Sequence, residues 1–200
     1  MTQPHSSTEK TALRRELRAR RAVLSADQHQ IAALAIARRV AGLRLVKPAR
    51  RIAAYIATGS ELSAWPVLLQ ALQRGSRVYL PRVPRRGRRL DFVRLDHAAQ
   101  WRMGAYGIPE ASHAEVITAR ELDVVFVPLL GFDDALARLG QGGGYYDSTF
   151  QFRRARRHWR RPLLVGIAFD EQRVDRLPVE RWDLRLDLIV TPTKVYRASH

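Results

Sequence analysis

Residues 123–147 read DVVFVPLLGFDDALARLGQGGGYYD, and this stretch indicates the fold more clearly than any other part of the chain. It opens with a continuous apolar run at 123–132, which is typical of a strand buried on both faces of a parallel sheet. Four glycines follow within 140–144, and a basic helix is predicted after them at about 145–158. The stretch therefore has the strand, glycine loop and helix order of an α/β protein.

Outside this stretch, further strands alternate with helices. We predict strands at 51–57, 77–81, 163–169 and 186–192, of which 186–192 is expected to be the last strand of the chain. The basic, turn-rich segment 82–94 is expected to lead into an antiparallel hairpin or an edge strand, and residues 106–111 are expected to form a loop. Helices are predicted over 8–23, from the capping box of Ser25 to Gly42, and from Ser63 to Gly75. The second helix is expected to bury Ile31, Leu34, Ile36 and Val40.

This pattern predicts an α/β fold, without an internal repeat or a domain linker. We expect a single domain spanning 1–200, with three α/β/α layers around a largely parallel central sheet. This would be a variant of the Rossmann-like arrangement, preceded by N-terminal helices.

The charge of the chain admits three interpretations. Lys and Arg together number 35 against 19 Asp and Glu, which gives a formal net charge of +16. Lysine occurs only at Lys10, Lys47 and Lys194, so arginine supplies the rest. The excess is typical of a nucleic-acid-binding protein, of a solvated surface on which arginine replaces lysine, or of a protein with a small polyanionic substrate. Charge alone does not separate the three.

Composition also excludes several classes of site. The chain has no cysteine, which excludes disulfide scaffolds, zinc fingers, iron–sulfur clusters and thiol catalysis. The first ten residues, MTQPHSSTEK, contain no apolar core, and no apolar run reaches transmembrane length. We therefore expect a cytoplasmic protein with no membrane association.

The glycine cluster has the chemistry of a phosphate site. Backbone N–H groups without neighbouring Cβ atoms close around phosphate oxygens, Arg138 is placed to neutralise a phosphate, and Asp147 to hold Mg²⁺. A flexible turn is the alternative. The cluster is not a Walker A loop, because no Lys-Ser/Thr pair follows it, and it lacks the third glycine of a dinucleotide fingerprint.

Other candidate residues carry weaker signals. Lys10 and Arg14 lie one helical turn apart and can grip one phosphate, and Glu61 follows a strand end. Ordinary solvated residues are the alternative for all three. The aromatic residues Trp101, Tyr106, Tyr145 and Tyr146 are candidates to line the pocket of a planar ligand. The basic run at 153–161 would either bind RNA or form a solvated helix face.

These motifs together resemble the 5-formyltetrahydrofolate cyclo-ligase family over nearly the whole chain. The matching stretches are Lys10-x-x-Leu13-Arg14, IAAYIATGSEL, GIPEA, PLLGFDDALARLGQGGGYYDSTF and GIAFDEQRVDRLPVERWDLRLDLIVTP. The resemblance implies ATP-dependent cyclisation of 5-formyltetrahydrofolate to 5,10-methenyltetrahydrofolate, with release of ADP and phosphate. The γ-phosphoryl group passes to the formyl oxygen, and N10 then attacks the activated carbon of this iminophosphate.

The resemblance also implies residue roles. ATP binding falls to Lys10, Arg14, Arg138, Leu139, Gly140, Gln141, Gly142, Gly143, Gly144, Tyr145, Tyr146 and Asp147. Folate binding falls to Ile56, Glu61 and Tyr145, catalysis to Lys10, Arg138 and Tyr145, and Mg²⁺ binding to Asp147 and Asp183. The folate is expected in monoglutamyl or polyglutamylated form.

Three departures from the family pattern are Leu136 for a glycine, Ser148 for an arginine and Phe169 for a histidine. We expect activity to survive them, because none alters Lys10, Arg14, the glycines or Asp147. The alternatives are an arginine-rich nucleic-acid-binding protein and a catalytically silent, nucleotide-binding family member. We expect a monomer without a nucleic-acid partner.

Overall fold

A computed structural model describes residues 5–104, 107–154 and 161–198. Its helices are α1 (His5–Ala22), α2 (Ala26–Gly42), α3 (Trp65–Gln73) and α4 (Tyr145–Thr149), with short 3₁₀ turns at Ala119–Glu121, Gln151–Arg153 and Asp170–Gln172. Its strands are β1 (Arg51–Ala53), β2 (Arg77–Arg82), β3 (Asp91–Leu95), β4 (Gln100–Met103), β5 (Pro109–Ser112), β6 (Val116–Ile117), β7 (Val124–Val127), β8 (Gly131–Phe132), β9 (Arg138–Leu139), β10 (Leu163–Ile167), β11 (Leu188–Val190) and β12 (Val195–Arg197).

A mixed sheet forms the centre of the fold. Within the described residues its strand order is β12-β11-β10-β7-β1-β2-β3-β6. The inner pairs β11–β10, β10–β7, β7–β1 and β1–β2 are parallel. Antiparallel pairs occur only toward the two edges, at β11–β12, β2–β3 and β3–β6. The prediction of an α/β fold with a largely parallel sheet is therefore confirmed.

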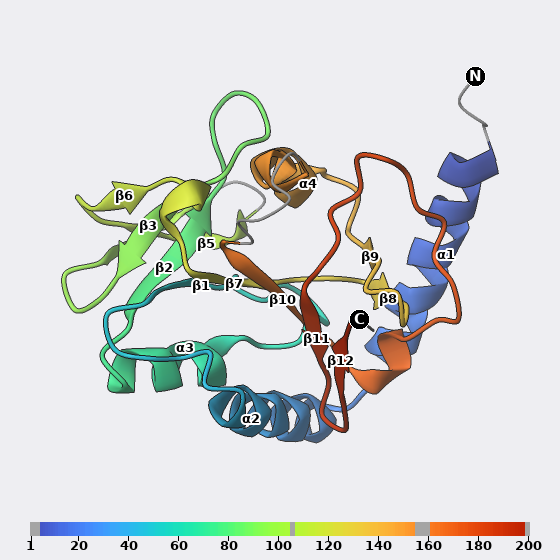
Figure 1. The fold of residues 1–200 in the computed structure, drawn as a ribbon, viewed down its shortest axis with the longest axis horizontal. Helices are drawn as coiled ribbons and strands as arrows, with labels where there is room; N and C mark the ends of the chain where they lie inside the picture. Colours follow the sequence, from blue (N-terminus) through green and yellow to red (C-terminus); the bar gives the residue numbers. More distant parts are fainter. Residues whose placement is uncertain (1–4, 105–106, 155–160, 199–200) are drawn as a thin grey trace.

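The central strands are buried on both faces, so their side chains alternate between two cores. On β7, Val124 and Phe126 enter one cluster, whereas Val125 and Val127 enter the other. Helices α2 and α3 cover the first face, as Figure 1 shows below the sheet. The other face is covered by thinner structure, namely the short helix α4, the turn Gln151–Arg153 and loop residues such as Leu136 and Leu184.

Helix α1 packs through a separate small core. Leu17 is fully buried in a cluster with Ala137, Leu139 and Leu177, apart from the two clusters on the sheet. In Figure 1 this helix stands beside the β8–β9 hairpin. The packing places the face of α1 that carries Lys10 and Arg14 next to the glycine loop that follows β9.

Several local predictions are wrong. Ile31 and Leu34 on α2 are 67% and 42% exposed, because the small side chains Ala32, Ala33 and Ala37 face the sheet together with Ile36 and Val40. The predicted loop 106–111 contains β5, paired with β4, and β12 follows the strand expected to be last.

Two predicted helices also differ from the structure. The N-cap of α3 is Ala64 rather than Ser63. The predicted helix at 145–158 is only five residues long as α4, and residues 155–160 lie outside the described part of the chain. In contrast, the capping box of Ser25 with Gln28 is present at the start of α2.

The parallel strands direct their carboxyl ends toward one end of the sheet, where α/β proteins build ligand sites. The segments that leave β1, β2 and β7 include Ile56, Val83 and Pro128, and all three line one cavity. The fold thus brings the glycine loop, the chain after β1 and helix α1 to the same place.

Candidate functional site

A cavity of about 1000 Å³ lies at these strand ends. Every residue to which the family resemblance gave a role lines it: Lys10, Arg14, Ile56, Glu61, Arg138, Leu139, Gly140, Gln141, Gly142, Gly143, Gly144, Tyr145, Tyr146, Asp147 and Asp183. The cavity is large enough for two drug-sized ligands side by side. Its lining combines cations and the backbone of the glycine loop with apolar side chains such as Ile56, Val83 and Leu90.

The glycine loop connects β9 to α4 and takes a backbone that other residues avoid. Gly142 has φ 109° and Gly144 has φ 69°, which L-residues with a Cβ rarely adopt. Helix α1 docks on the loop, because Arg14 Nε donates to the Gly140 carbonyl oxygen at 2.9 Å and Arg18 donates to the Gln141 side chain at 3.1 Å. The loop and α1 therefore form one wall of the cavity.

Arg138 and Asp147 form a partly buried ion pair inside this wall. Arg138 Nη2 lies 3.0 Å from Asp147 Oδ1, which also accepts from the Leu184 backbone N–H at 2.9 Å. A second guanidinium nitrogen donates to the Pro128 carbonyl oxygen at 3.2 Å. Burial alone would raise the pKa of Asp147, but the Arg138 guanidinium and the Leu184 N–H hold that pKa below its usual value. Asp147 is therefore a carboxylate at neutral pH.

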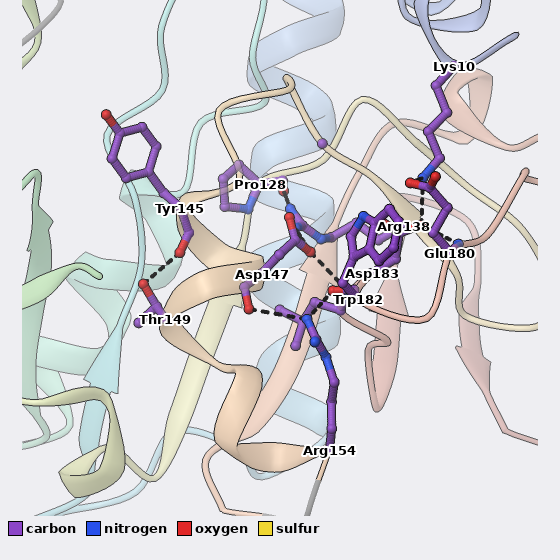
Figure 2. A network of polar contacts seen from close by, with 12 residues as sticks. Lys10, Pro128, Arg138, Tyr145, Asp147, Thr149, Arg154, Glu180, Trp182 and Asp183 are labelled. Carbon is purple, nitrogen blue, oxygen red and sulfur yellow. Dashed lines mark hydrogen bonds and ion pairs between the residues drawn. The ribbon is translucent and has the colours of Figure 1, made fainter. Parts of the chain in front are cut away.

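Lys10 reaches the cavity from α1 and meets two carboxylates. Its Nζ lies 2.8 Å from Glu180 Oε2 and 2.7 Å from Asp183 Oδ2 (Figure 2). Burial would lower the pKa of Lys10, yet the hydrogen bonds to Asp183 and Glu180 raise it above its ordinary value. The ammonium is therefore protonated, and only 7% of the residue is exposed.

Glu61 lines the cavity from the segment after β1. Its carboxylate accepts from the Thr58 backbone N–H at 3.0 Å and from the Thr58 hydroxyl at 3.2 Å. The Gln141 amide donates to the second oxygen at 3.0 Å, which joins Glu61 to the glycine loop. Ile56 lies on the same segment and packs against the core. Glu61 thus presents an oriented carboxylate beside the apolar side chain of Ile56, an arrangement that suits a flat ligand with N–H donors.

The cavity contains two carboxylates of the type that binds magnesium. Among the described residues no group of three or more His, Asp or Glu side chains could hold a metal by itself. Mg²⁺ does not need such a cage, since it is commonly held by one or two carboxylates, water and phosphate oxygens. Asp147 and Asp183 are carboxylates of the right type, although each already accepts from a cation, Arg138 and Lys10 respectively.

Some site residues were missed by the sequence, and others were misplaced. Trp101 packs against Trp65 and does not line the cavity, and Tyr106 lies outside the described residues, as does most of the basic run 153–161. Several residues that line the cavity were given no role in it from the sequence: Tyr55, Arg88, Arg154, Glu180 and Trp182.

Leu136 has φ 61°, a left-handed conformation that glycine adopts without strain. Asp133, which is 4% exposed, supports this turn by accepting from the Ala135, Ala137 and Leu177 backbone N–H groups. The departure at Leu136 is thus accommodated in the turn between β8 and β9, away from the glycines.

Comparisons with known proteins agree with this geometry. The model of the 5-formyltetrahydrofolate cyclo-ligase family matches residues 6–192. The chain is 35% identical to 5-formyltetrahydrofolate cyclo-ligase of Escherichia coli K12 over 185 residues, which covers 90% of this chain and 98% of that one. The mouse enzyme of the same name is 27% identical over 189 residues, covering 90% and 92% of the two chains.

A solved structure is similar as well. The NMR structure of Aquifex aeolicus 5,10-methenyltetrahydrofolate synthetase superposes with a TM-score of 0.79 at 28% identity, and covers 94% of this chain and 92% of that chain. The fold, the cavity and the sequence matches thus agree, and the chain belongs to the 5-formyltetrahydrofolate cyclo-ligase family.

Proposed function

We propose that this protein is an ATP-dependent 5-formyltetrahydrofolate cyclo-ligase, which forms 5,10-methenyltetrahydrofolate, ADP and phosphate. The γ-phosphoryl group of ATP passes to the formyl oxygen, and N10 of the folate then attacks the activated carbon and displaces phosphate. The observation that carries the proposal is one cavity lined both by the glycine loop with its neighbouring cations and by Glu61 with apolar side chains. Such a reaction depends on positioning and charge stabilisation more than on a strong base.

The phosphate end is assigned to the glycine loop 140–144 and to three cations. Backbone N–H groups of the loop and the guanidinium of Arg14 hold the phosphate chain, while Lys10 and Arg138 stabilise the charge that develops during transfer. This assignment is supported by the fixed positions of these cations, each of which is held by an acceptor on another element. Leu139 and Tyr146 complete the nucleotide wall.

The folate end is assigned to Glu61, Ile56 and Tyr145. Glu61 accepts from N–H donors of the pterin ring, and Ile56 packs against its face. Tyr145 begins α4 directly after the glycines, which suits a position between the two substrates. Bound Mg²⁺, held by Asp147 and Asp183, would neutralise phosphate charge.

The direct test is an absorbance assay for the methenyl product. We expect its near-ultraviolet absorbance to appear only when 5-formyltetrahydrofolate, ATP and Mg²⁺ are all present. Folded protein that binds ATP without turnover would instead support a catalytically silent family member. RNA binding that weakens steeply with salt, together with no nucleotide binding, would support the nucleic-acid alternative.

We further propose that the protein works as a cytoplasmic, single-domain monomer that needs neither a nucleic acid nor a membrane. In the described part of the chain, no helix is long and apolar enough to cross a membrane. Sedimentation of the purified protein tests the oligomeric state.

Glu61→Gln should weaken folate binding selectively. The substitution removes the charge and replaces one acceptor oxygen with an NH₂ group, and a hydrogen bond to a charged group is worth about 1.5–3 kcal/mol. We expect kcat/KM for 5-formyltetrahydrofolate to fall about 10- to 100-fold, with the KM for ATP little changed. Steady-state kinetics with each substrate varied in turn measures both values, and an unchanged folate KM would contradict the assignment.

Gly131→Ala should disturb the cavity through α1. A Cβ at this position would lie 2.5 Å from Leu17 Cδ1, and Leu17 is fully buried, so the helix that carries Lys10 and Arg14 has to shift. We expect a loss of stability of about 1–3 kcal/mol and a higher KM for ATP. Gly42→Ala is the control, because no atom lies within 4 Å of its added Cβ. Equal denaturation midpoints and equal kinetics for the two variants would refute the prediction.

A further inference from the structure

Glu180 is a carboxylate in the cavity to which neither the reaction nor the family resemblance gave a role. It lies in a segment without helix or strand, 170 residues from Lys10 in the sequence. Its Oε2 accepts from Lys10 Nζ at 2.8 Å, and the Glu180 side chain is only 22% exposed. It thus contacts one of the cations assigned to phosphoryl transfer.

A tight turn fixes the position of this carboxylate. The Glu180 backbone N–H donates to Asp183 Oδ2 at 2.7 Å, and the Asp183 backbone N–H donates to the Glu180 carbonyl oxygen at 3.0 Å. The turn therefore presents both carboxylates to the same side, where Lys10 Nζ lies between them (Figure 2). The next residue, Leu184, donates to Asp147, so one short segment supports both cation–carboxylate groups of the phosphate end.

We propose that Glu180 is a positioning residue, which together with Asp183 holds the Lys10 ammonium at the phosphate end of the cavity. An ammonium has three N–H donors, and two of them are used by these carboxylates, which leaves the third for a phosphate oxygen. The proposal deepens the proposed function, on which it rests for the role of Lys10.

The benefit of this arrangement lies in the flexibility of lysine. The four-carbon side chain of lysine has many rotamers, so fixing it at the substrate costs conformational entropy. If the ammonium is already held in place before ATP binds, this entropy is not lost during the reaction. The arrangement also carries a liability. Without Lys10 the two carboxylates would carry a charge of about −2, with no cation beside them, and would repel a phosphate chain. The effect of removing Glu180 must therefore depend on whether Lys10 is present.

A double-mutant cycle with Lys10→Ala and Glu180→Ala tests this dependence. In the presence of Lys10, Glu180→Ala is expected to lower kcat about 10- to 100-fold and to weaken ATP binding by a smaller factor. In the Lys10→Ala background, Glu180→Ala is expected to leave kcat unchanged and to tighten ATP binding severalfold, because it removes an unpaired negative charge. Calorimetric titration with ATP measures binding without turnover.

Each result of the cycle decides for or against the role. If Glu180→Ala lowers kcat by the same factor in both backgrounds, Glu180 does not act through Lys10 and the proposal is overturned. Glu180→Gln keeps the shape and one acceptor oxygen, so its kcat is expected between those of the wild type and Glu180→Ala, and a lower value would also overturn the proposal. Glu171→Ala, at an exposed glutamate, is the matched control and should behave as wild type.

The cycle also separates this proposal from the proposed function. Wild-type protein that binds ATP but forms no methenyl product would refute the cyclo-ligase activity. The calorimetric arm would still test Glu180 in that case, since the reversal of its effect on ATP affinity does not require turnover. Loss of affinity on Glu180→Ala in both backgrounds would refute the positioning role alone.

Discussion

Asp147→Ala is expected to remove nearly all activity and much of the stability of the protein. Arg138 would lose its carboxylate partner while its side chain is only 4% exposed, and breaking a buried pair in this way costs about 3–5 kcal/mol. The Leu184 N–H would also lose its acceptor. We expect a clearly lower midpoint of chemical denaturation, and a fall in kcat/KM for ATP of about 100- to 1000-fold.

An exposed pair of the same two residue types provides the control for Asp147→Ala. Asp134 and Arg173 form an ion pair with side chains that are 55% and 41% exposed, so Asp134→Ala should cost about 1 kcal/mol or less. Asp147→Asn, which keeps one oxygen for the Leu184 N–H, should recover part of the stability but little of the activity. Near wild-type kinetics in either Asp147 variant would contradict the assignment of Asp147 to the site.

Lys10→Ala is the second change with a large expected effect. It removes a protonated, nearly buried ammonium from the phosphate end and leaves Glu180 and Asp183 facing the cavity without their cation. The transferred phosphoryl group loses a stabilising cation and is also repelled by the two carboxylates, and both effects lower the rate. We therefore expect kcat/KM for ATP to fall about 100- to 1000-fold. Lys47→Ala removes a lysine that is exposed on the surface, and it should leave the kinetics unchanged. Equal rates for the two lysine variants would refute the role given to Lys10.

The sequence correctly predicted elements whose formation depends on interactions between residues that are close together in the chain. The capping box of Ser25 and the apolar run of β7 depend on neighbouring residues, and both are present in the structure. The buried face of α2 does not depend on periodicity alone. Its alanines allow the helix to lie close to the sheet, so Ile31 and Leu34 turn outward despite their hydrophobicity.

The candidate site also has parts that short stretches of sequence reveal and parts that depend on contacts between distant residues. The glycine loop is visible in the sequence because its residues are consecutive. The partners of Lys10 are not visible, because Glu180 and Asp183 lie at the far end of the chain and only the folded turn brings them to α1. For Lys10, Arg14 and Glu61 the local signal was weak, and the family resemblance was needed to single them out.

The separate packing of α1 means that two cations of the phosphate end, Lys10 and Arg14, lie on a helix outside the two cores of the sheet. The two cores on the sheet contain no residue of α1. The helix is attached by Leu17, by the ion pairs of Lys10, and by hydrogen bonds of Arg14, Arg18 and Arg21. Damage to this helix therefore removes the phosphate-binding cations while the sheet keeps its own cores. Expression yield and solubility are poor guides to function for any variant or fusion that alters the first 22 residues of the chain.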